Sequence, residues 1–291
     1  MRSTRRATIH GTLLGVTFFF AAWSTYAQRS QDLDKCTSNA WTSDEIDSQI
    51  KICTEHIQSN PGNQKDVITA LESRGALYLG RLDYAKAISD FARAIDLDPT
   101  DVAALNGRGY AYYRGGDYQH AIADYSEAIR IDPNLGWYDF RGDAYLHAGD
   151  FDHAILDYTE AISNQPHHKF GKSSADLLLA RGNAYFLKKD YDHALADYGA
   201  VQRAEPPFSF GVNVQSLFAR GVAYFAKNDY ERARVDFDAV LAKSPLHAQA
   251  LYGRGVTKIK LGDYQGGNRD IDAAKGMSGD VAESMAGLGV K

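Results

Sequence analysis

Residues 74–99 read RGALYLGRLDYAKAISDFARAIDLDP, and the same arrangement of residue types returns five more times along the chain. Each copy begins with Arg-Gly, continues with Asp and an aromatic residue, and then places a small residue four positions before a large apolar one. A proline closes each of the first five copies. The six arginines that open the copies are Arg74, Arg108, Arg141, Arg181, Arg220 and Arg254.

Each position of this unit suits a pair of antiparallel helices. Gly75 and Ala87 are small enough for two helices to cross closely, and Phe91 fills the gap beside them. Asp83 is a typical N-cap, because its carboxylate accepts free backbone N–H groups at a helix start. Pro99 ends the second helix, since proline cannot continue one. We therefore predict an all-α chain of helix–turn–helix units, which stack because one unit cannot bury its own apolar face.

The unit resembles the tetratricopeptide repeat (TPR), on the strength of Gly75-Ala76-Leu77-Tyr78, Asp83-Tyr84, Ala87, Phe91, Ala94 and Pro99. The resemblance implies a right-handed superhelical solenoid of six repeats with a concave groove lined by the first helix of each. It also implies a protein or peptide as the partner. We place the six units within 67–281, at about 68–101, 102–134, 135–168, 175–208, 214–247 and 248–281. The sixth unit departs from the pattern, with Gly267 at the small position and no closing proline.

The N-terminus has the order of a secretory signal peptide. Three arginines precede an apolar run at residues 11–23, and small residues end at Ala27. We predict residues 1–27 to be cleaved after Ala27, the alternative being a retained anchor. The remaining chain has no apolar run long enough to span a membrane. The absence of an N-x-S/T sequon favours the bacterial periplasm within the wider prediction of a periplasmic or secreted protein.

Residues 28–66 are predicted to form a small helical N-terminal cap. A helix is expected over residues 46–59, ahead of Pro61. The only two cysteines, Cys36 and Cys53, both lie in this segment, and an even count in an exported chain indicates a disulfide. The alternative is two separate buried thiols. At the other end, we expect a short closing helix near residues 278–286 and a tail over 282–291.

Charge and motifs argue against several functions. The formal net charge is −5, and removal of three arginines with the signal peptide would lower it further. Nucleic acid is therefore an unsuitable partner, because neutralising phosphates needs a basic surface. No phosphate loop, zinc signature or nucleophile motif is present, so no enzyme activity, cofactor or metal is predicted. Equivalent histidines in three units, His120, His153 and His193, lie too far apart to share one ion.

An aspartate follows each repeat arginine by sixteen residues. This recurrence predicts structural ion pairs between the two helices of each unit, and its rival is a row of arginines that binds a polyanion. The six aspartates are Asp90, Asp124, Asp157, Asp197, Asp236 and Asp270.

The resemblance places a peptide-binding groove at three positions of each first helix: two residues before the repeat arginine, two residues after it, and four residues after the glycine. The residues at these positions that we select are Asn106, Tyr110, Tyr113, Asp139, Asp143, Leu146, Leu179, Asn183, Phe186, Phe218, Phe225 and Tyr252. Insertions after Pro166 and Pro206 predict a second contact on one rim, through Phe170, Phe208 and Phe210. The alternative is that these insertions fold over the neighbouring helices.

These observations favour a non-catalytic scaffold or adaptor of the cell envelope that holds a partner in the concave groove. The main alternative is a regulatory subunit of an envelope enzyme or assembly complex. A hydrolase of envelope polymers is a third reading, and it would need a carboxylate or histidine pair in the groove. No pattern in the sequence indicates an oligomeric state.

Overall fold

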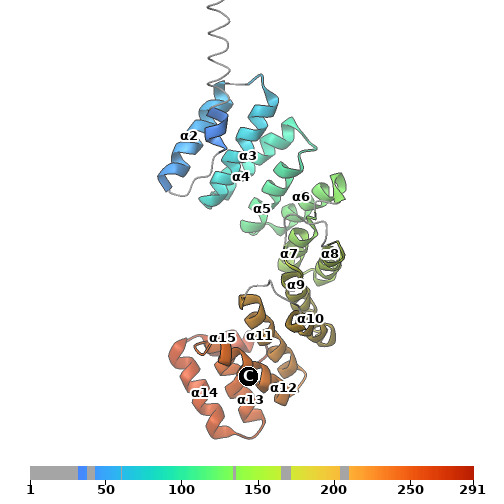
Figure 1. The fold of residues 1–291 in the computed structure, drawn as a ribbon, viewed down its shortest axis with the longest axis vertical. Helices are drawn as coiled ribbons and strands as arrows, with labels where there is room; N and C mark the ends of the chain where they lie inside the picture. The colour runs from blue at the N-terminus through green and yellow to red at the C-terminus, as the bar shows by residue number, and fades with distance from the viewer. Residues whose placement is uncertain (1–31, 38–42, 60, 134–135, 165–171, 204–209) are drawn as a thin grey trace, which may run out of the picture. The chain divides into compact units, whose positions relative to one another are not determined.

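The computed structural model describes residues 32–37, 43–59, 61–133, 136–164, 172–203 and 210–291, and throughout them the regular structure is α-helical (Figure 1). The predicted signal peptide lies outside this part of the chain. A short helical stretch at residues 32–36 precedes α2 (Ser43–Ser59), and six helix pairs follow it. They are α3 (Gln64–Gly80) with α4 (Tyr84–Leu97), α5 (Val102–Arg114) with α6 (Tyr118–Ile131), α7 (Tyr138–Ala148) with α8 (Phe151–Ser163), α9 (Ser174–Leu187) with α10 (Tyr191–Arg203), α11 (Phe210–Ala226) with α12 (Tyr230–Lys243), and α13 (Ala248–Lys260) with α14 (Tyr264–Met277). A short helix, α15 (Val281–Gly287), ends the chain.

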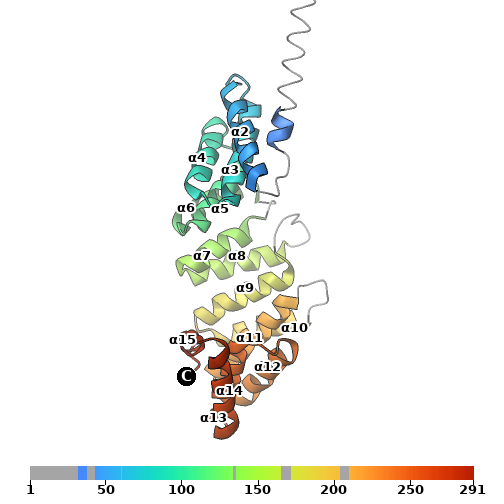
Figure 2. The ribbon, with the colours of Figure 1, turned by 90° about the vertical axis from the view of Figure 1, so that its left-hand side faces the viewer.

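The chain divides into two compact units, residues 1–124 and 125–291. In the first, α2, α3, α4 and α5 pack in chain order (Figure 2). In the second, α7 to α14 do the same, and α15 packs on α13 and α14. First helices also touch the next first helix, as α9 does with α7 and α11. The described part of each unit is therefore a stack of helix–turn–helix repeats, and none of its helices is long and apolar enough to cross a membrane.

Glycine and a buried aromatic ring meet where the two helices of a repeat cross. A Cβ atom placed on Gly142 would stand 2.9 Å from the Tyr158 ring, and one on Gly182 would stand 2.6 Å from the Tyr198 ring. These rings are almost fully buried, as are Tyr125 and Phe237 at the equivalent position. Only glycine leaves room for a ring so close to the first helix.

The turn between the two helices is the same in all six pairs. One residue adopts a left-handed conformation, and an aspartate follows it. The left-handed residues are Leu82, Gly116, Gly149, Lys189, Asn228 and Gly262. Asp83 and Asp150 then cap the second helix by accepting from the backbone N–H of Lys86 and His153. The predicted aspartate caps are thus present, while Leu82 and Lys189 occupy a conformation that side chains usually avoid.

Two element boundaries differ from expectation. The first repeat begins at Gln64, ahead of the predicted start near residue 68, because Asn63 caps α3. The insertion after Pro206 is partly helical, since α11 already begins at Phe210. The short closing helix expected near residues 278–286 is α15, and the predicted tail packs on the last repeat, where Met285 and Val290 are fully buried.

Candidate binding surface

A pocket of about 540 Å³ opens in the second compact unit, mainly on the first helices of four successive repeats, α7, α9, α11 and α13. Five of the predicted groove residues line it: Leu146 from α7, Leu179, Asn183 and Phe186 from α9, and Phe218 from α11. The other lining residues are Leu187, Tyr198, Gln215, Ala219, Val222, His247, Gln249 and Leu288. Among the described lining residues there is no aspartate, glutamate, lysine or arginine, so the polar groups they offer are amides, a hydroxyl and an imidazole.

The polar groups of the pocket are held in place by bonds to the fold. Asn183 Oδ1 accepts a 2.9 Å hydrogen bond from the Tyr198 hydroxyl. His247 Nδ1 accepts from the backbone N–H of Ala250 at 3.2 Å, so His247 caps α13. Burial lowers the pKa of the His247 imidazole, which is therefore neutral at pH 7. A neutral ring that accepts at Nδ1 carries its proton on Nε2, and this N–H is a donor at the pocket wall.

Two predicted groove carboxylates are occupied by the chain itself. Asp139 is buried and accepts from the backbone N–H of Lys172 at 3.2 Å. Asp143 accepts from the Tyr158 hydroxyl at 2.6 Å and forms a close ion pair with the Lys172 ammonium group. Burial raises the pKa of Asp139, which the bond from Lys172 partly offsets. These carboxylates hold the segment that leads into α9, so their hydrogen-bonding groups are already engaged within the chain.

Other predicted groove residues lie elsewhere. Phe225 is a correction, because its ring is only 6% exposed and packs edge-on against Tyr230 in the core. Tyr252 packs against the same core cluster and does not line the pocket. In the first compact unit Tyr110 and Tyr113 lie with ring centroids 6.5 Å apart on α5, the helix that also carries Asn106.

The rim prediction falls largely outside the described residues. Phe170 and Phe208 lie beyond them, and Phe210 is the first residue of α11. The described end of this insertion packs on the neighbouring helix, as in the alternative, since Val212 is buried and Asn213 exchanges hydrogen bonds with Gln202; the contact through Phe210 stays a prediction.

All six arginine–aspartate pairs are present in the structure. In each, two guanidinium nitrogens bond the carboxylate, with closest N···O distances of 2.6 to 2.8 Å. Four arginines use their third nitrogen to reach the preceding helix pair or the cap: Arg74 bonds Thr54, Arg141 bonds Ser126, Arg181 bonds Thr159 and Arg254 bonds Asp238. The arginines thus brace neighbouring helices and offer no free row of cations to a polyanion.

The three equivalent histidines have local partners. Nδ1 of His120, His153 and His193 lies 2.7 Å from the carboxylate of Asp117, Asp150 and Asp190, respectively. Each ring stacks at 5.0 Å on Tyr112, Tyr145 or Tyr185 of the first helix. Within the residues that the structure describes, no three His, Cys, Asp or Glu side chains gather to hold a metal.

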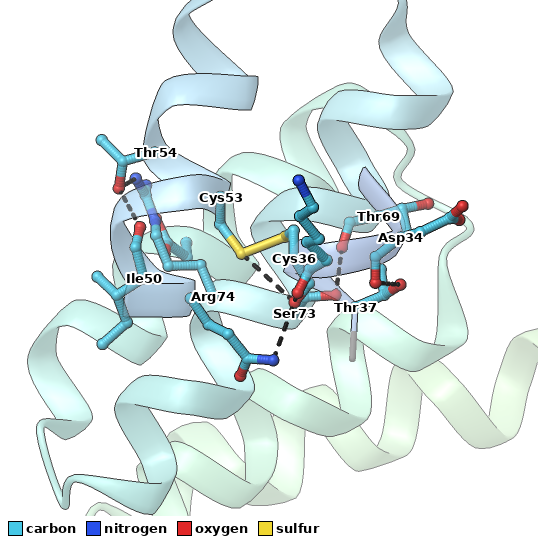
Figure 3. Close-up of a disulfide and its surroundings, with 12 residues drawn as sticks. Asp34, Cys36, Thr37, Ile50, Cys53, Thr54, Thr69, Ser73 and Arg74 are labelled. Atoms are coloured by element: carbon cyan, nitrogen blue, oxygen red, sulfur yellow. Dashed lines mark hydrogen bonds and ion pairs between the residues drawn. A yellow bond between two sulfur atoms is a disulfide. The ribbon is translucent and has the colours of Figure 1, made fainter. Parts of the chain in front are cut away.

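The N-terminal cap is closed on itself by a disulfide and is joined to the first repeat by a hydrogen bond (Figure 3). Cys36 and Cys53 are joined, and both are buried in the core of the first compact unit. Thr54, next to Cys53 on α2, accepts from Arg74 of the first repeat at 2.8 Å. The cap therefore closes the exposed end of the repeat stack.

Eight of the thirteen described lining residues were not predicted from the sequence. Leu187, Gln215, His247 and Gln249 lie one helical turn or a helix end away from the three positions that were considered. His247 carried a usable signal, since it stands directly before α13 at the N-cap position. Leu288 lies in the predicted C-terminal tail, and nothing in the sequence indicated that it would line the pocket.

Comparison with known proteins agrees with this architecture. A family model described as Tetratricopeptide repeat matches residues 73–135, 141–208 and 218–276, more than half of the chain. A comparison with curated proteins finds no significant match.

Three similar solved structures share the fold. YrrB, described as a TPR protein with an unusual peptide-binding site, is 18% identical at a TM-score of 0.52, over 67% of this chain and 97% of its own. PilW, a type IV pilus biogenesis factor, is 15% identical with a TM-score of 0.59, and the match covers 72% of this chain and 93% of PilW. PilF of Pseudomonas aeruginosa is 15% identical with a TM-score of 0.58, and the match covers 77% of this chain and 98% of PilF. At these identities the likeness extends to the fold alone.

Proposed function

Because this chain belongs to the tetratricopeptide-repeat family, whose members generally mediate protein–protein interaction, we propose that it is a non-catalytic scaffold that holds a segment of a partner polypeptide on its first helices. One observation carries the proposal: the first helices of four successive repeats line one pocket whose described residues are uncharged, and five of those residues occupy the predicted groove positions. Apolar walls supply binding energy, and fixed amides suit the donors and acceptors of a peptide backbone.

We further propose that the protein works in the cell envelope, after removal of residues 1–27. The support is the signal-like order of the N-terminal residues and the joined cysteines of the cap, which persist in oxidising compartments. Fractionation of expressing bacteria, with the N-terminus of the recovered protein read by mass spectrometry, tests this. Recovery in the cytosol with an intact N-terminus would refute it.

Site-specific photo-crosslinking in intact cells tests the binding function. A photoreactive residue at Leu187 or Gln215 stands at the pocket, and both side chains are exposed enough to replace. Val235, a 57% exposed residue of second helix α12, is the matched control outside the pocket. We expect protein adducts from the pocket positions and few from Val235.

The pattern of adducts also separates the rival functions. One partner at a fixed ratio identifies a regulatory or assembly subunit, and many partners identify a scaffold with varied clients. Adducts from Val235 alone, with none from the pocket, would refute the use of the first helices for binding.

A further inference from the structure

A second pocket of about 260 Å³ adjoins the first in the C-terminal repeat. The two share His247 and Gln249, so the apolar pocket continues into the smaller one along the start of α13. The smaller pocket is polar, and its other lining residues are Ala248, Ser278, Asp280, Val281 and Ser284. Asp280 is the one charged residue in the described lining of either pocket.

We propose that the two pockets bind one segment of the partner polypeptide, with an uncharged aliphatic or aromatic side chain in the first and a lysine or arginine against Asp280 in the second. This inference rests on the proposed function and specifies the partner it selects.

The first pocket excludes charged side chains. Its walls include Leu146, Leu179, Phe186 and Phe218, and its described lining holds no lysine, arginine, aspartate or glutamate to pair with a charge. Burying an unpaired charge among such residues costs far more than the surrounding contacts can return. Its volume of about 540 Å³ falls within the range of ligand pockets, which leaves room for one large side chain and the backbone beside it.

The shared wall suits a peptide backbone. The His247 Nε2–H is a donor, because Nδ1 is already used to cap α13. Gln249 Nε2 donates to Ser284 Oγ at 2.8 Å, which fixes this carboxamide between the two pockets. A backbone carbonyl that passes from the first pocket to the second meets His247 on the way.

The second pocket favours a cation. Asp280 keeps its charge near neutral pH, because a hydrogen bond from Ser278 lowers the pKa of its carboxyl group. Asp280 makes no side-chain cap bond to α15, so its remaining acceptor sites face no competing backbone donor of that helix. The formal net charge of −5 also draws a basic partner toward the chain.

A positional-scanning library of short synthetic peptides, blocked at both termini, tests the inference on the purified chain. We expect selection of a segment with a large apolar residue and a nearby lysine or arginine. Leu187→Asp, which adds a charge at the rim of the first pocket, should weaken the best peptide by roughly tenfold or more. Asp280→Lys should weaken it by about threefold to tenfold and exchange the basic preference for an acidic one.

Val235→Asp is the matched control, since it adds the same charge at an exposed apolar residue outside both pockets and should leave the affinity unchanged. If Leu187→Asp lowers the melting temperature, Gln215→Glu replaces it, because Gln215 is exposed and lines the same pocket. Selection of peptides without an apolar residue, a basic preference that survives Asp280→Lys, or no selection at all would overturn the inference.

Two results separate this inference from the function on which it rests. If pocket positions crosslink to a partner while Leu187→Asp and Asp280→Lys bind it as well as the wild type, the function stands and the inference fails. Self-association that Leu187→Asp abolishes would identify a second copy of the chain as the occupant, and would also overturn the inference.

Discussion

Four of the six repeat arginines bond two neighbouring helices at once. Arg141 donates to Asp157 at 2.7 and 2.8 Å and to Ser126 at 3.1 Å. Arg141→Ala should destabilise the chain by about 3 kcal/mol, because it leaves the buried Asp157 carboxylate without its cation. Chemical denaturation measures this loss. The pair Arg141→Met with Asp157→Leu should recover most of it, since apolar replacements remove both charges together.

An exposed ion pair is the control for this prediction. Arg130 and Glu127 pair on the surface of α6, and Arg130→Ala should change stability little. An Arg141→Ala variant that melts like the wild type but loses affinity for polyanions would favour the rejected role in polyanion binding.

A carboxyl pair in the first compact unit makes stability depend on pH. Burial raises the pKa of Glu72 to about 7, and the charge and hydrogen bond of Asp101 add to this shift. The folded chain holds the Glu72 proton between pH 4.5 and about 7, whereas the unfolded chain releases it, so stability falls as pH rises through this window. Asp101 meanwhile caps α5 by accepting from Ala103 and Ala104.

Glu72→Gln should therefore raise stability at mildly alkaline pH, by about 1 kcal/mol once solvent screening of this half-exposed group is allowed for. The variant and the wild type should have equal stability below pH 4.5, where Glu72 is protonated in both states of the wild type. Thermal melts over this pH range measure the difference. Glu283→Gln, on the exposed side of α15, is the control, and an equal gain there would contradict the assignment.

At this scale the sequence predicted partners within a repeat better than partners between repeats. The sixteen-residue spacing placed all six aspartates opposite their arginines, because that spacing joins two helices of one hairpin. It did not predict Ser126 or Thr159 as additional acceptors. Their contacts depend on how one helix pair stacks on the next, which a spacing within the repeat does not encode.

The turn inside the first repeat carries a residue that does not suit its backbone. Leu82 has φ 59° and is 61% exposed, while three equivalent turns have glycine there. Leu82→Gly should stabilise the chain by about 1 kcal/mol, because it removes a left-handed side chain and sacrifices little packing. Differential scanning calorimetry measures the gain in melting temperature.

Two substitutions control for the Leu82 effect. Gly262→Leu makes the reverse change in the last repeat, at φ 92°, and should destabilise. Leu156→Gly removes an equally exposed leucine from the interior of α8 and should also destabilise, because glycine weakens a helix. If Leu82→Gly destabilised as Leu156→Gly does, strain at this turn would be ruled out as the cause.

Helix boundaries were predictable where a cap or a proline marks them and less so elsewhere. Asp83 and Pro99 mark the ends of α4, and the structure ends this helix at Leu97. The start of α11 has no such mark. It is extended because Val212 is buried and Asn213 bonds Gln202, both consequences of tertiary packing.

The division between pocket and core was not predictable for similar residues. Phe218 and Phe225 are both aromatic residues of α11 at expected groove positions. Phe218 lines the pocket beside His247, whereas Phe225 packs edge-on against Tyr230 in the core. Which of two such rings is covered depends on the neighbouring helix.

In the molecule as a whole, the helix contacts within each compact unit join neighbours in the stack, so a local loss of stability should fade along it. Cys36→Ala with Cys53→Ala removes a bond across 17 residues and should destabilise the N-terminal cap by about 3 kcal/mol. Hydrogen exchange followed by mass spectrometry should then show faster amide exchange in α2 and α3 and an unchanged rate in α13 and α14. Met285→Ala, which leaves a cavity under α15, is the opposite control and should accelerate exchange in α13 to α15 alone. If either variant accelerated amide exchange equally in every helix, the whole chain would unfold as one cooperative unit. Only in that case does a loss of stability at one end lower the opening free energy of all helices alike.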